Sequence, residues 1–290
     1  MRAPTPRVLR CGRFVLQLDK PLIMGVVNVT PDSFSDGGPY HHPDAAIAHA
    51  RELIIEGADI IDIGGESTRP GAMPVSTADE LARVLPVLDA LRGATVPISV
   101  DTWKPEVMAV VLEHGASMIN DVNAFAAPGA LEAVMESDCA LCLMHKKGDP
   151  RTMQTGPTYV DVVTEVRDFL AERVGVAQAA GIARQRLVVD PGFGFGKTAV
   201  HNLQLLRKLD SMQALGLPVM AGLSRKSLLG RITGRTVGER QAASVAAALL
   251  AVERGAALVR VHDVAATRDA LQVLSAVNDP DYRFNDELTR

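Results

Sequence analysis

Polar and charged residues recur in this chain directly after short apolar runs. Carboxylates accept N–H groups, a carboxamide both donates and accepts, and lysine or arginine binds anions, so these residue types are suited to a binding or catalytic site. A lone polar residue at such a point often only braces a loop, which is the interpretation favoured for Asp62, Asp121 and Asp263. Recurrence along the whole chain indicates a site. The positions are Asn28, Asp62, Glu66, Asp101, Asn120, Asp121, His145, Asp190, Ser224, Lys226, Arg260 and His262.

Familiar catalytic motifs do not account for this set. The stretch GFGFGKT at Gly192–Thr198 is similar to a phosphate loop, but Pro191 stands where that pattern requires glycine. Lys197 likewise occupies the third glycine position of a dinucleotide fingerprint. His145 and the pair His41-His42 lack the spacing of zinc ligands. The sequence therefore gives little support to kinase, NAD or zinc chemistry.

Eight apolar runs alternate with segments of helical periodicity and are the elements that must position these residues. This alternation predicts a (β/α)8 TIM barrel, with a doubly wound open sheet as the alternative, because periodicity does not reveal closure. We expect one domain over residues 1–290, a barrel core of about residues 22–278, and a hairpin at Val8–Leu18 that caps the barrel bottom. The predicted strands are Ile23–Asn28, Ile60–Ile63, Ile98–Asp101, Met118–Asp121, Ala140–Met144, Leu187–Asp190, Val219–Gly222 and Leu258–Val261.

The helices should begin at clear start signals and bury one apolar stripe each. Start signals stand at Pro43-Asp44, Ser76-Thr77 and Lys104-Pro105. The expected stripes include Val163, Val166, Leu170 and Val174, and, at the end of the chain, Ala266, Ala270, Val273 and Val277.

Composition and charge limit the classes of partner. The net charge of −4 gives no reason to expect binding to nucleic acid or to an anionic membrane surface. No apolar run reaches membrane length and the first residues lack an apolar signal core, so a cytoplasmic location is expected. The cysteines are Cys11, Cys139 and Cys142, and this odd number agrees with a reducing compartment. Cys139 and Cys142 lie in an apolar run and are predicted to be small core residues.

Five longer strings resemble the dihydropteroate synthases of bacterial folate synthesis, which belong to the pterin-binding superfamily. The resemblance extends in order from about Leu22 to Thr267. It implies a transferase of folate biosynthesis that joins (7,8-dihydropterin-6-yl)methyl diphosphate to 4-aminobenzoate and releases diphosphate, and that is a target of sulfonamides. The strings are MGVVNVTPDSFSDGG at Met24–Gly38, GADIIDIGGESTRPGA at Gly57–Ala72, DPGFGFGK at Asp190–Lys197, GLSRKSLLG at Gly222–Gly230 and RVHDV at Arg260–Val264.

The family positions imply a role for each pterin-binding residue. Asp190 accepts two neighbouring N–H groups of the aminopyrimidinone edge, Asn120 pairs with the adjoining edge, and Asp101 faces the N–H of the reduced ring. Lys226 donates to the ring carbonyl and the adjacent nitrogen, and Met144 lies against the ring face.

The leaving diphosphate calls for Mg²⁺ and fixed cations. The resemblance assigns Asn28 to the metal, Arg260 and His262 to the diphosphate, and Arg69 as a further contact. Because an aromatic amine is already neutral near pH 7, the reaction needs no strong base, and a dissociative path is expected in which Asp101 and Asp190 stabilise a cationic pterin methylene.

The aminobenzoate pocket is implied to form from two loops, Thr30–Gly38 and Ser67–Ala72, whose glycine and proline content suits closure over substrate. Ser227, which opens a helix, would hold the carboxylate through its hydroxyl and the N–H groups there. The remaining contacts assigned to this substrate are Phe34, Thr68, Arg69, Pro70 and Phe195.

Two alternatives remain at this level: a corrinoid-linked methyltransferase of the same superfamily, and a pterin-binding paralogue without turnover. The strings SRKS, RVH and STRPGA favour the synthase, because a methyltransferase needs neither a diphosphate site nor an aminobenzoate loop. A homodimer is expected from the resemblance. The alanine-rich segment Gln241–Ala251 offers a flat face for it, although that face could instead pack on the barrel.

Overall fold

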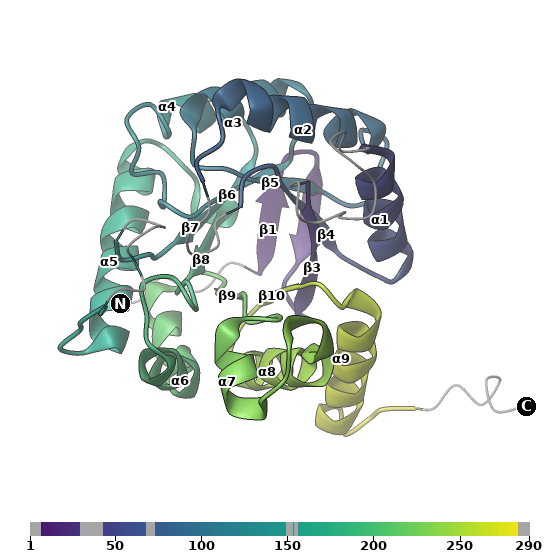
Figure 1. Ribbon diagram of the computed structural model, residues 1–290, viewed down its shortest axis with the longest axis vertical. Coiled ribbons are helices and arrows are strands. Elements are labelled where there is room, and N and C mark those ends of the chain that lie inside the picture. The colour runs from purple at the N-terminus through teal and green to yellow at the C-terminus, as the bar shows by residue number, and fades with distance from the viewer. Residues whose placement is uncertain (1–6, 30–42, 68–72, 149–152, 154–155, 284–290) are drawn as a thin grey trace, which may run out of the picture.

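The structure, a computed structural model, describes residues 7–29, 43–67, 73–148, 153 and 156–283. A two-stranded hairpin comes first, and strands then alternate with helices to the end of the chain (Figure 1). The strands are β1 (Val8–Cys11), β2 (Phe14–Gln17), β3 (Leu22–Asn28), β4 (Ile60–Gly64), β5 (Ile98–Asp101), β6 (Met118–Asp121), β7 (Ala140–Met144), β8 (Leu187–Asp190), β9 (Met220–Ala221) and β10 (Leu258–Val261). The helices are α1 (Pro43–Ile55), α2 (Thr77–Ala90), α3 (Pro105–Glu113), α4 (Glu132–Met135), α5 (Val162–Ala179), α6 (Ala199–Arg207), α7 (Ser227–Thr233), α8 (Gln241–Glu253) and α9 (Val264–Asn278).

Eight parallel strands form one sheet in the order β8-β7-β6-β5-β4-β3-β10-β9. The two ends of this sheet meet through a parallel bridge between Val189 and Val219 and a backbone hydrogen bond of 3.0 Å from the Val189 N–H to the Pro218 carbonyl. The sheet is therefore a closed barrel with helices around it, as predicted, and not the open doubly wound alternative. The strand at the seam, β9, has two residues, whereas four were predicted.

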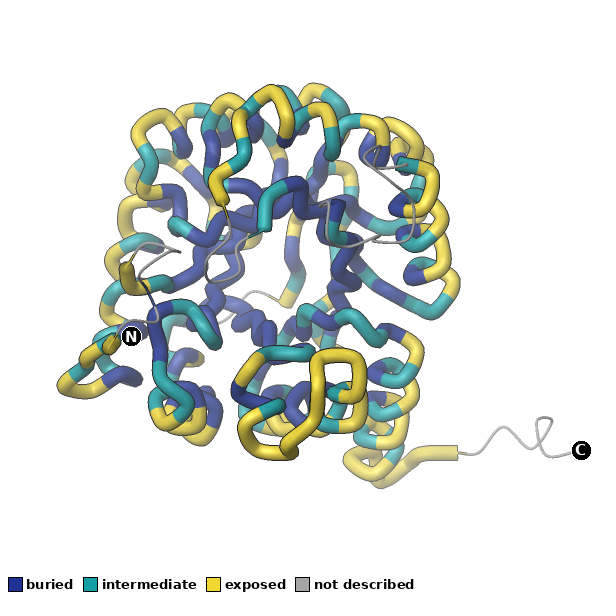
Figure 2. The backbone as a smooth tube through the Cα atoms, in the orientation of Figure 1, coloured by how far each residue is buried: buried dark blue, intermediate teal, exposed yellow. Residues whose placement is uncertain are grey.

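The barrel has apolar packing on both faces of its strands, as expected for parallel strands. One buried cluster lies between the strands and the helices, and a second lies inside the barrel. Figure 2 shows the resulting ring of buried strands within a rim of more exposed helices.

The N-terminal hairpin closes the lower end of the barrel, as predicted. Leu9 and Cys11 of β1 are fully buried and belong to the cluster inside the barrel, with Met118, Cys142 and Leu258 of the barrel strands. The Gly12 N–H donates to the Asp138 carbonyl at 2.9 Å, and the Cys11 thiol donates to the Ser117 carbonyl at 3.1 Å. Among the described residues, this packing closes the end of the barrel opposite the carboxyl ends of the strands.

The predicted helix starts are confirmed at Pro43 and at the N-caps Ser76 and Lys104. The stripe of α5 is also confirmed, since Val163, Val166, Leu170 and Val174 are all buried.

The predicted stripe of α9 is wrong. Val273 and Val277 are 65% and 76% exposed, and the buried residues are Val264, Thr267 and Leu271. Helical spacing is satisfied equally by both sets, and the threonine in the buried set lowered its apparent hydrophobicity. Contact with α8 and β3 selects the face that packs. No helix in the described part of the chain is long and apolar enough to cross a membrane.

Candidate active site

The polar residues predicted from the sequence lie at the carboxyl ends of the barrel strands, one layer above the apolar interior. Because side chains alternate between the two faces of a strand, a residue two positions after an inward apolar residue also points inward. Four interior residues, Ile60, Met118, Val188 and Leu258, are each followed in this way by a polar residue. The four polar residues are Asp62, Asn120, Asp190 and Arg260, and all four line the open end of the barrel.

Arg260 stands at the centre of a buried polar network. Its Nε donates to Asp62 Oδ2 at 2.6 Å and its Nη2 donates to Asp101 Oδ2 at 3.0 Å. Asn120 Nδ2 donates to the same Asp62 oxygen at 3.1 Å. Asp62, expected to be a scaffold residue, is therefore a direct partner of two site residues. That expectation is wrong, because the partners of Asp62 come from strands distant in the sequence that face it across the barrel interior.

Burial and charge shift the pKa values in this network in opposite directions. Burial raises the pKa of Asp101 to about 7, against the lowering effect of Arg260, and the Asp62 carboxylate raises it further. Burial alone would lower the pKa of Arg260, but Asp62 and Asp101 more than reverse this and raise it above the ordinary value. Arg260 therefore keeps its charge, whereas Asp101 can change protonation state near neutral pH.

Asp190 lies at the end of β8 and presents a carboxylate to the barrel mouth. Its Oδ1 accepts the Gly192 N–H at 2.7 Å, which fixes the side chain. Burial raises the pKa of Asp190, while the nearby Lys226 and the Gly192 N–H lower it. The buried oxygens Asn120 Oδ1 and Asp62 Oδ1 have no hydrogen-bond partner among the described residues. Unpaired buried acceptors are costly, so a ligand that offers several N–H donors fits this mouth.

The loop after β8 depends on glycine. Gly192 and Gly196 have φ of +67° and +63°, and a Cβ at either position would lie 1.9 or 2.1 Å from a backbone carbonyl oxygen, of His145 and Lys147 respectively. Lys197 is turned inward beneath this loop, where its ammonium donates to the Gly192 carbonyl at 2.8 Å and the Phe195 carbonyl at 3.0 Å. A lysine bound to carbonyls in this way does not face a phosphate, which agrees with the rejection of a phosphate loop.

A buried pair beneath the loop was missed in the sequence. Lys197 Nζ lies 2.9 Å from His145 Nδ1. Burial and then the Lys197 charge lower the pKa of His145 to about 3, and burial lowers the pKa of Lys197 well below its usual range. His145 is thus a neutral acceptor that supports the loop. No motif relates these two residues, which are 52 positions apart.

Lys226 reaches the mouth from the loop after β9. Its ammonium donates to the Phe193 carbonyl and lies 4.6 Å from the centroid of the Phe195 ring. Burial lowers the pKa of Lys226 to about 8, and the Asp190 carboxylate limits the decrease. Lys226, from the loop after β9, thus lies close to both Asp190 and Phe195 at one side of the mouth.

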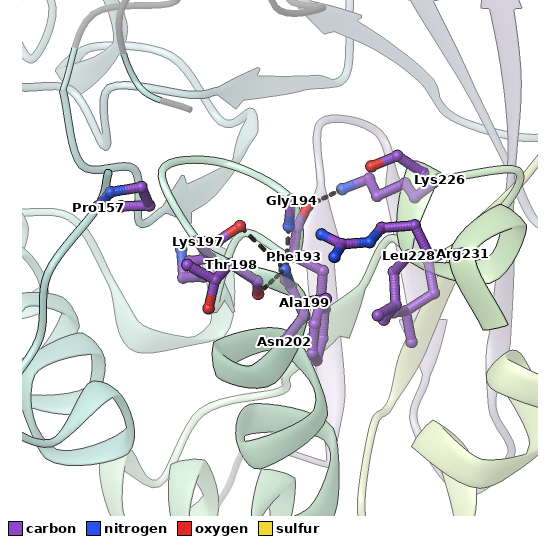
Figure 3. Close-up of a pocket in the computed structure, with 12 residues that line it drawn as sticks. Pro157, Phe193, Gly194, Lys197, Thr198, Ala199, Asn202, Lys226, Leu228 and Arg231 are labelled. Atoms are coloured by element: carbon purple, nitrogen blue, oxygen red, sulfur yellow. Dashed lines mark hydrogen bonds between the residues drawn. The ribbon is translucent and has the colours of Figure 1, made fainter. Parts of the chain in front are cut away.

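A cavity of about 160 Å³ opens beside Lys226 (Figure 3). It lies between the loop after β8, which contributes Phe193 and Gly194, and helix α7, which contributes Ser227. Ser227 is exposed and is the first residue of α7. Ser227 thus lies where a substrate held beside Lys226 can reach it.

The remaining described candidates lie around the same mouth. Met144 is buried at the end of β7, and Asn28 is half-buried at the end of β3. His262 Nδ1 lies 3.0 Å from the Ser224 hydroxyl, which also accepts the His262 backbone N–H at 3.2 Å. Phe34, Thr68, Arg69 and Pro70, with most of their loops, lie outside the described residues.

Asp121 and Asp263 have the scaffold roles expected of them. Asp121 accepts the backbone N–H groups of Asn123 and Phe125, both at 2.7 Å, in a turn where Phe125 has a φ of +56°. Asp263 forms an ion pair with Arg225 at 2.6 Å. Cys139 and Cys142 are buried, as predicted for core residues.

Comparisons of the sequence and of the structure with known proteins all indicate the same family. Residues 24–262 match the family described as "Pterin binding enzyme". The dihydropteroate synthase of Neisseria meningitidis serogroup C is 52% identical over 275 residues, which cover 93% of this chain and 97% of that protein.

Two solved structures have the same fold. That of Xanthomonas albilineans dihydropteroate synthase with 4-aminobenzoic acid has a TM-score of 0.90 and 54% identity, covering 95% of this chain and 100% of that one. That of Burkholderia cenocepacia dihydropteroate synthase complexed with 7,8-dihydropteroate has a TM-score of 0.85 and 51% identity, covering 95% and 98%.

Proposed function

The chain belongs to the pterin-binding enzymes and, among them, to the dihydropteroate synthases, and from this premise we propose how its residues carry out the reaction. It is a transferase that makes 7,8-dihydropteroate from a dihydropterin and 4-aminobenzoate. The dihydropterin is activated as its 6-methyl diphosphate, and diphosphate leaves. The observation that carries this assignment is the set of unpaired buried acceptors at the barrel mouth, Asn120 Oδ1 and Asp62 Oδ1, beside the Asp190 carboxylate.

The pterin binds with its donor edge toward these acceptors. Asp190 Oδ1 is already engaged by Gly192, so Oδ2 is the oxygen with most freedom to accept from the aminopyrimidinone edge. Asn120 is fixed through its Nδ2 on Asp62, so that its oxygen accepts from the adjoining edge. Lys226 donates to the ring carbonyl and the adjacent nitrogen, and Met144 packs on the ring face. In this way the ligand satisfies the Asn120 oxygen, which is otherwise buried without a partner.

The bond from the pterin methylene to the diphosphate oxygen breaks first, and the electron pair leaves with that oxygen. The positive charge spreads into the ring, where the carboxylates of Asp101 and Asp190 stabilise it. The neutral amine of 4-aminobenzoate then forms the C–N bond, and the proton released from its nitrogen goes to solvent. A secondary deuterium isotope effect at the methylene clearly above unity is expected, and an effect near unity would oppose this order.

Arg260, His262 and Arg69 bind the leaving diphosphate, and Asn28 would hold Mg²⁺ beside it. The two carboxylates on Arg260 occupy two of its five N–H donors, so the guanidinium can also bind an anion. Asn28 offers one amide oxygen, and Mg²⁺ is commonly held by one or two protein oxygens together with waters and substrate phosphates, so the residues fit the ion. When bound, Mg²⁺ neutralises charge that develops on the leaving oxygens.

4-Aminobenzoate binds between Phe195, Ser227 and the two loops that carry Phe34, Thr68, Arg69 and Pro70. We expect those loops to complete the pocket only around bound diphosphate, so binding should be ordered. Titration of 4-aminobenzoate should give measurable affinity only with diphosphate and Mg²⁺ present. Equal affinity without them would mean a preformed pocket.

The protein is further proposed to be a cytoplasmic homodimer. The alanines of α8 that were considered for this contact, Ala247 and Ala251, are buried against the barrel. The outward residues of α8 and the adjoining α9, among them Leu250, Val273 and Val277, are 40% to 76% exposed and give an apolar surface for a second copy. Sedimentation equilibrium tests this, and a monomer at micromolar concentration would oppose it.

The function itself is tested by turnover. Release of diphosphate should require the pterin diphosphate, 4-aminobenzoate and Mg²⁺ together, with dihydropteroate formed in equal amount. Binding of the pterin without any product would instead indicate a non-catalytic paralogue. Transfer of a methyl group from a methylated folate would indicate the methyltransferase.

A further inference from the structure

The cavity beside Lys226 has a charge pattern that selects for anions. The described residues that line it include three cations, Lys197, Lys226 and Arg231, and no aspartate or glutamate. Two of the three cations already have partners within the protein. Lys197 is buried on backbone carbonyls and His145, and Lys226 contacts the Phe193 carbonyl and the Phe195 ring. The cation that is left to meet a ligand at the outer side of this cavity is Arg231.

Arg231 is exposed, and no described residue forms a hydrogen bond or ion pair with its guanidinium. Figure 3 shows the guanidinium extended from α7 across the cavity toward Gly194. Two neighbouring arginines are engaged: Arg225 is paired with Asp263, and Arg240 donates to the Arg225 carbonyl at 3.0 Å. The five N–H donors of Arg231 are thus directed into a space that contains no carboxylate.

Ser227 and Arg231 are four residues apart on α7, so they lie on one side of the helix. Ser227 follows Lys226 directly, and Arg231 is one turn farther from the barrel mouth. An aromatic amine whose nitrogen meets the pterin methylene near Lys226 must direct its para substituent outward along this line. At the outer end of this line the planar guanidinium of Arg231 offers parallel N–H donors that suit a carboxylate.

We propose that Arg231 binds the carboxylate of 4-aminobenzoate and makes the enzyme select anionic over neutral aromatic amines. This rests on the proposed function, because it deepens the description of the same acceptor site. Arg231 and Ser227 then both bind the carboxylate, and Lys226 beside them binds the pterin. The role belongs to substrate binding, so it changes KM and leaves the chemical step unaffected.

The test is Arg231→Gln, which removes the charge but keeps a polar side chain of similar reach. The matched control is Arg235→Gln, since Arg235 is also exposed, follows the same helix and faces Glu239 at 3.7 Å instead of the cavity. For a partly exposed charge pair we expect the KM for 4-aminobenzoate to rise about five-fold in Arg231→Gln. Its kcat and its KM for the pterin diphosphate should be unchanged, and the control should behave as the wild type.

A neutral acceptor separates charge from shape. With 4-aminobenzamide as the amine, kcat/KM should be equal in Arg231→Gln and the wild type, and inhibition by neutral sulfanilamide should be equal as well. Arg231→Lys should recover part of the lost affinity for the anion. Raising the ionic strength should weaken 4-aminobenzoate binding more in the wild type than in Arg231→Gln.

An unchanged KM for 4-aminobenzoate in Arg231→Gln would overturn the proposal, and so would equal losses for the anionic and the neutral amine. Failure of the proposed function looks different, because the wild type would then form no dihydropteroate at all.

Discussion

Replacement of Asp190 by asparagine tests the pterin site most directly. Asp190 is only 4% exposed, and one carboxylate oxygen accepts the Gly192 N–H at 2.7 Å. In Asp190→Asn the amide must give its single oxygen either to Gly192 or to the pterin. Whichever way it turns, an NH₂ group then faces another N–H donor in a buried place.

The magnitude follows from these two losses. A hydrogen bond to a charged acceptor contributes about 1.5–3 kcal/mol, and a buried donor without a partner costs about 1–3 kcal/mol. Taking about 3 kcal/mol for both together, the Kd for the pterin diphosphate should rise about 100-fold or more. The fold should not suffer, because burial raises the pKa of Asp190 and so already disfavours its charge in the folded protein.

Calorimetric titration of the pterin diphosphate into Asp190→Asn measures the loss, and Asp210→Asn makes the same chemical change at an exposed position. Urea unfolding of both variants should give free energies close to that of the wild type. The reasoning fails if folded Asp190→Asn binds the pterin with unchanged affinity, or if it loses affinity only in proportion to lost stability.

Three further results are expected. Since the pKa of Lys226 is about 8, kcat/KM for the pterin diphosphate should fall as pH rises through about 8 and the ammonium loses its proton; in Lys226→Arg that limb should move to higher pH, and an unmoved limb would assign it to another group. Gly192→Ala should lower the free energy of unfolding in urea by about 3 kcal/mol or more, and Gly115→Ala, where φ is +97° and nothing lies within 4 Å, by only about 1–2 kcal/mol; equal losses would refute the steric argument. Lys104→Met should cost about 3–5 kcal/mol in the same assay, because Lys104 is the cation 2.5 Å from fully buried Glu80; a loss under 1 kcal/mol would show that the carboxylate relaxes or becomes protonated.

Strand positions could be predicted well from the sequence, because each apolar run is bounded by residues that end a buried strand. Ile98–Asp101 and Leu187–Asp190 have the predicted bounds. The strand at Val219–Gly222 is shorter than predicted, and Val219 pairs with Val189 in an isolated bridge that closes the barrel. Pairing between β8 and β9 depends on closure of the whole sheet, so the length of β9 could not be predicted from its local sequence.

The site could be predicted as a set of residues but not as a network. Alternation along single strands brings Asn120, Asp190 and Arg260 to one mouth, and a sequence pattern records alternation. The bonds that Arg260 makes with Asp62 and Asp101 join residues 198 and 159 positions apart. Which carboxylate meets which cation is decided by the barrel interior, so the contact of Asp62 with Arg260 could not be predicted from the sequence.

The hairpin at the lower end of the barrel also determines when part of the fold can form during translation. Leu9 and Cys11 leave the ribosome before any barrel strand, yet their partners include Leu258 of the last strand. The cluster that buries their apolar face is complete only when the final strand has been made, and until then chaperones and other nascent chains compete for what is exposed. Because Cys11 is fully buried in the finished protein, pulsed alkylation of its thiol during translation would time the moment at which the hairpin docks.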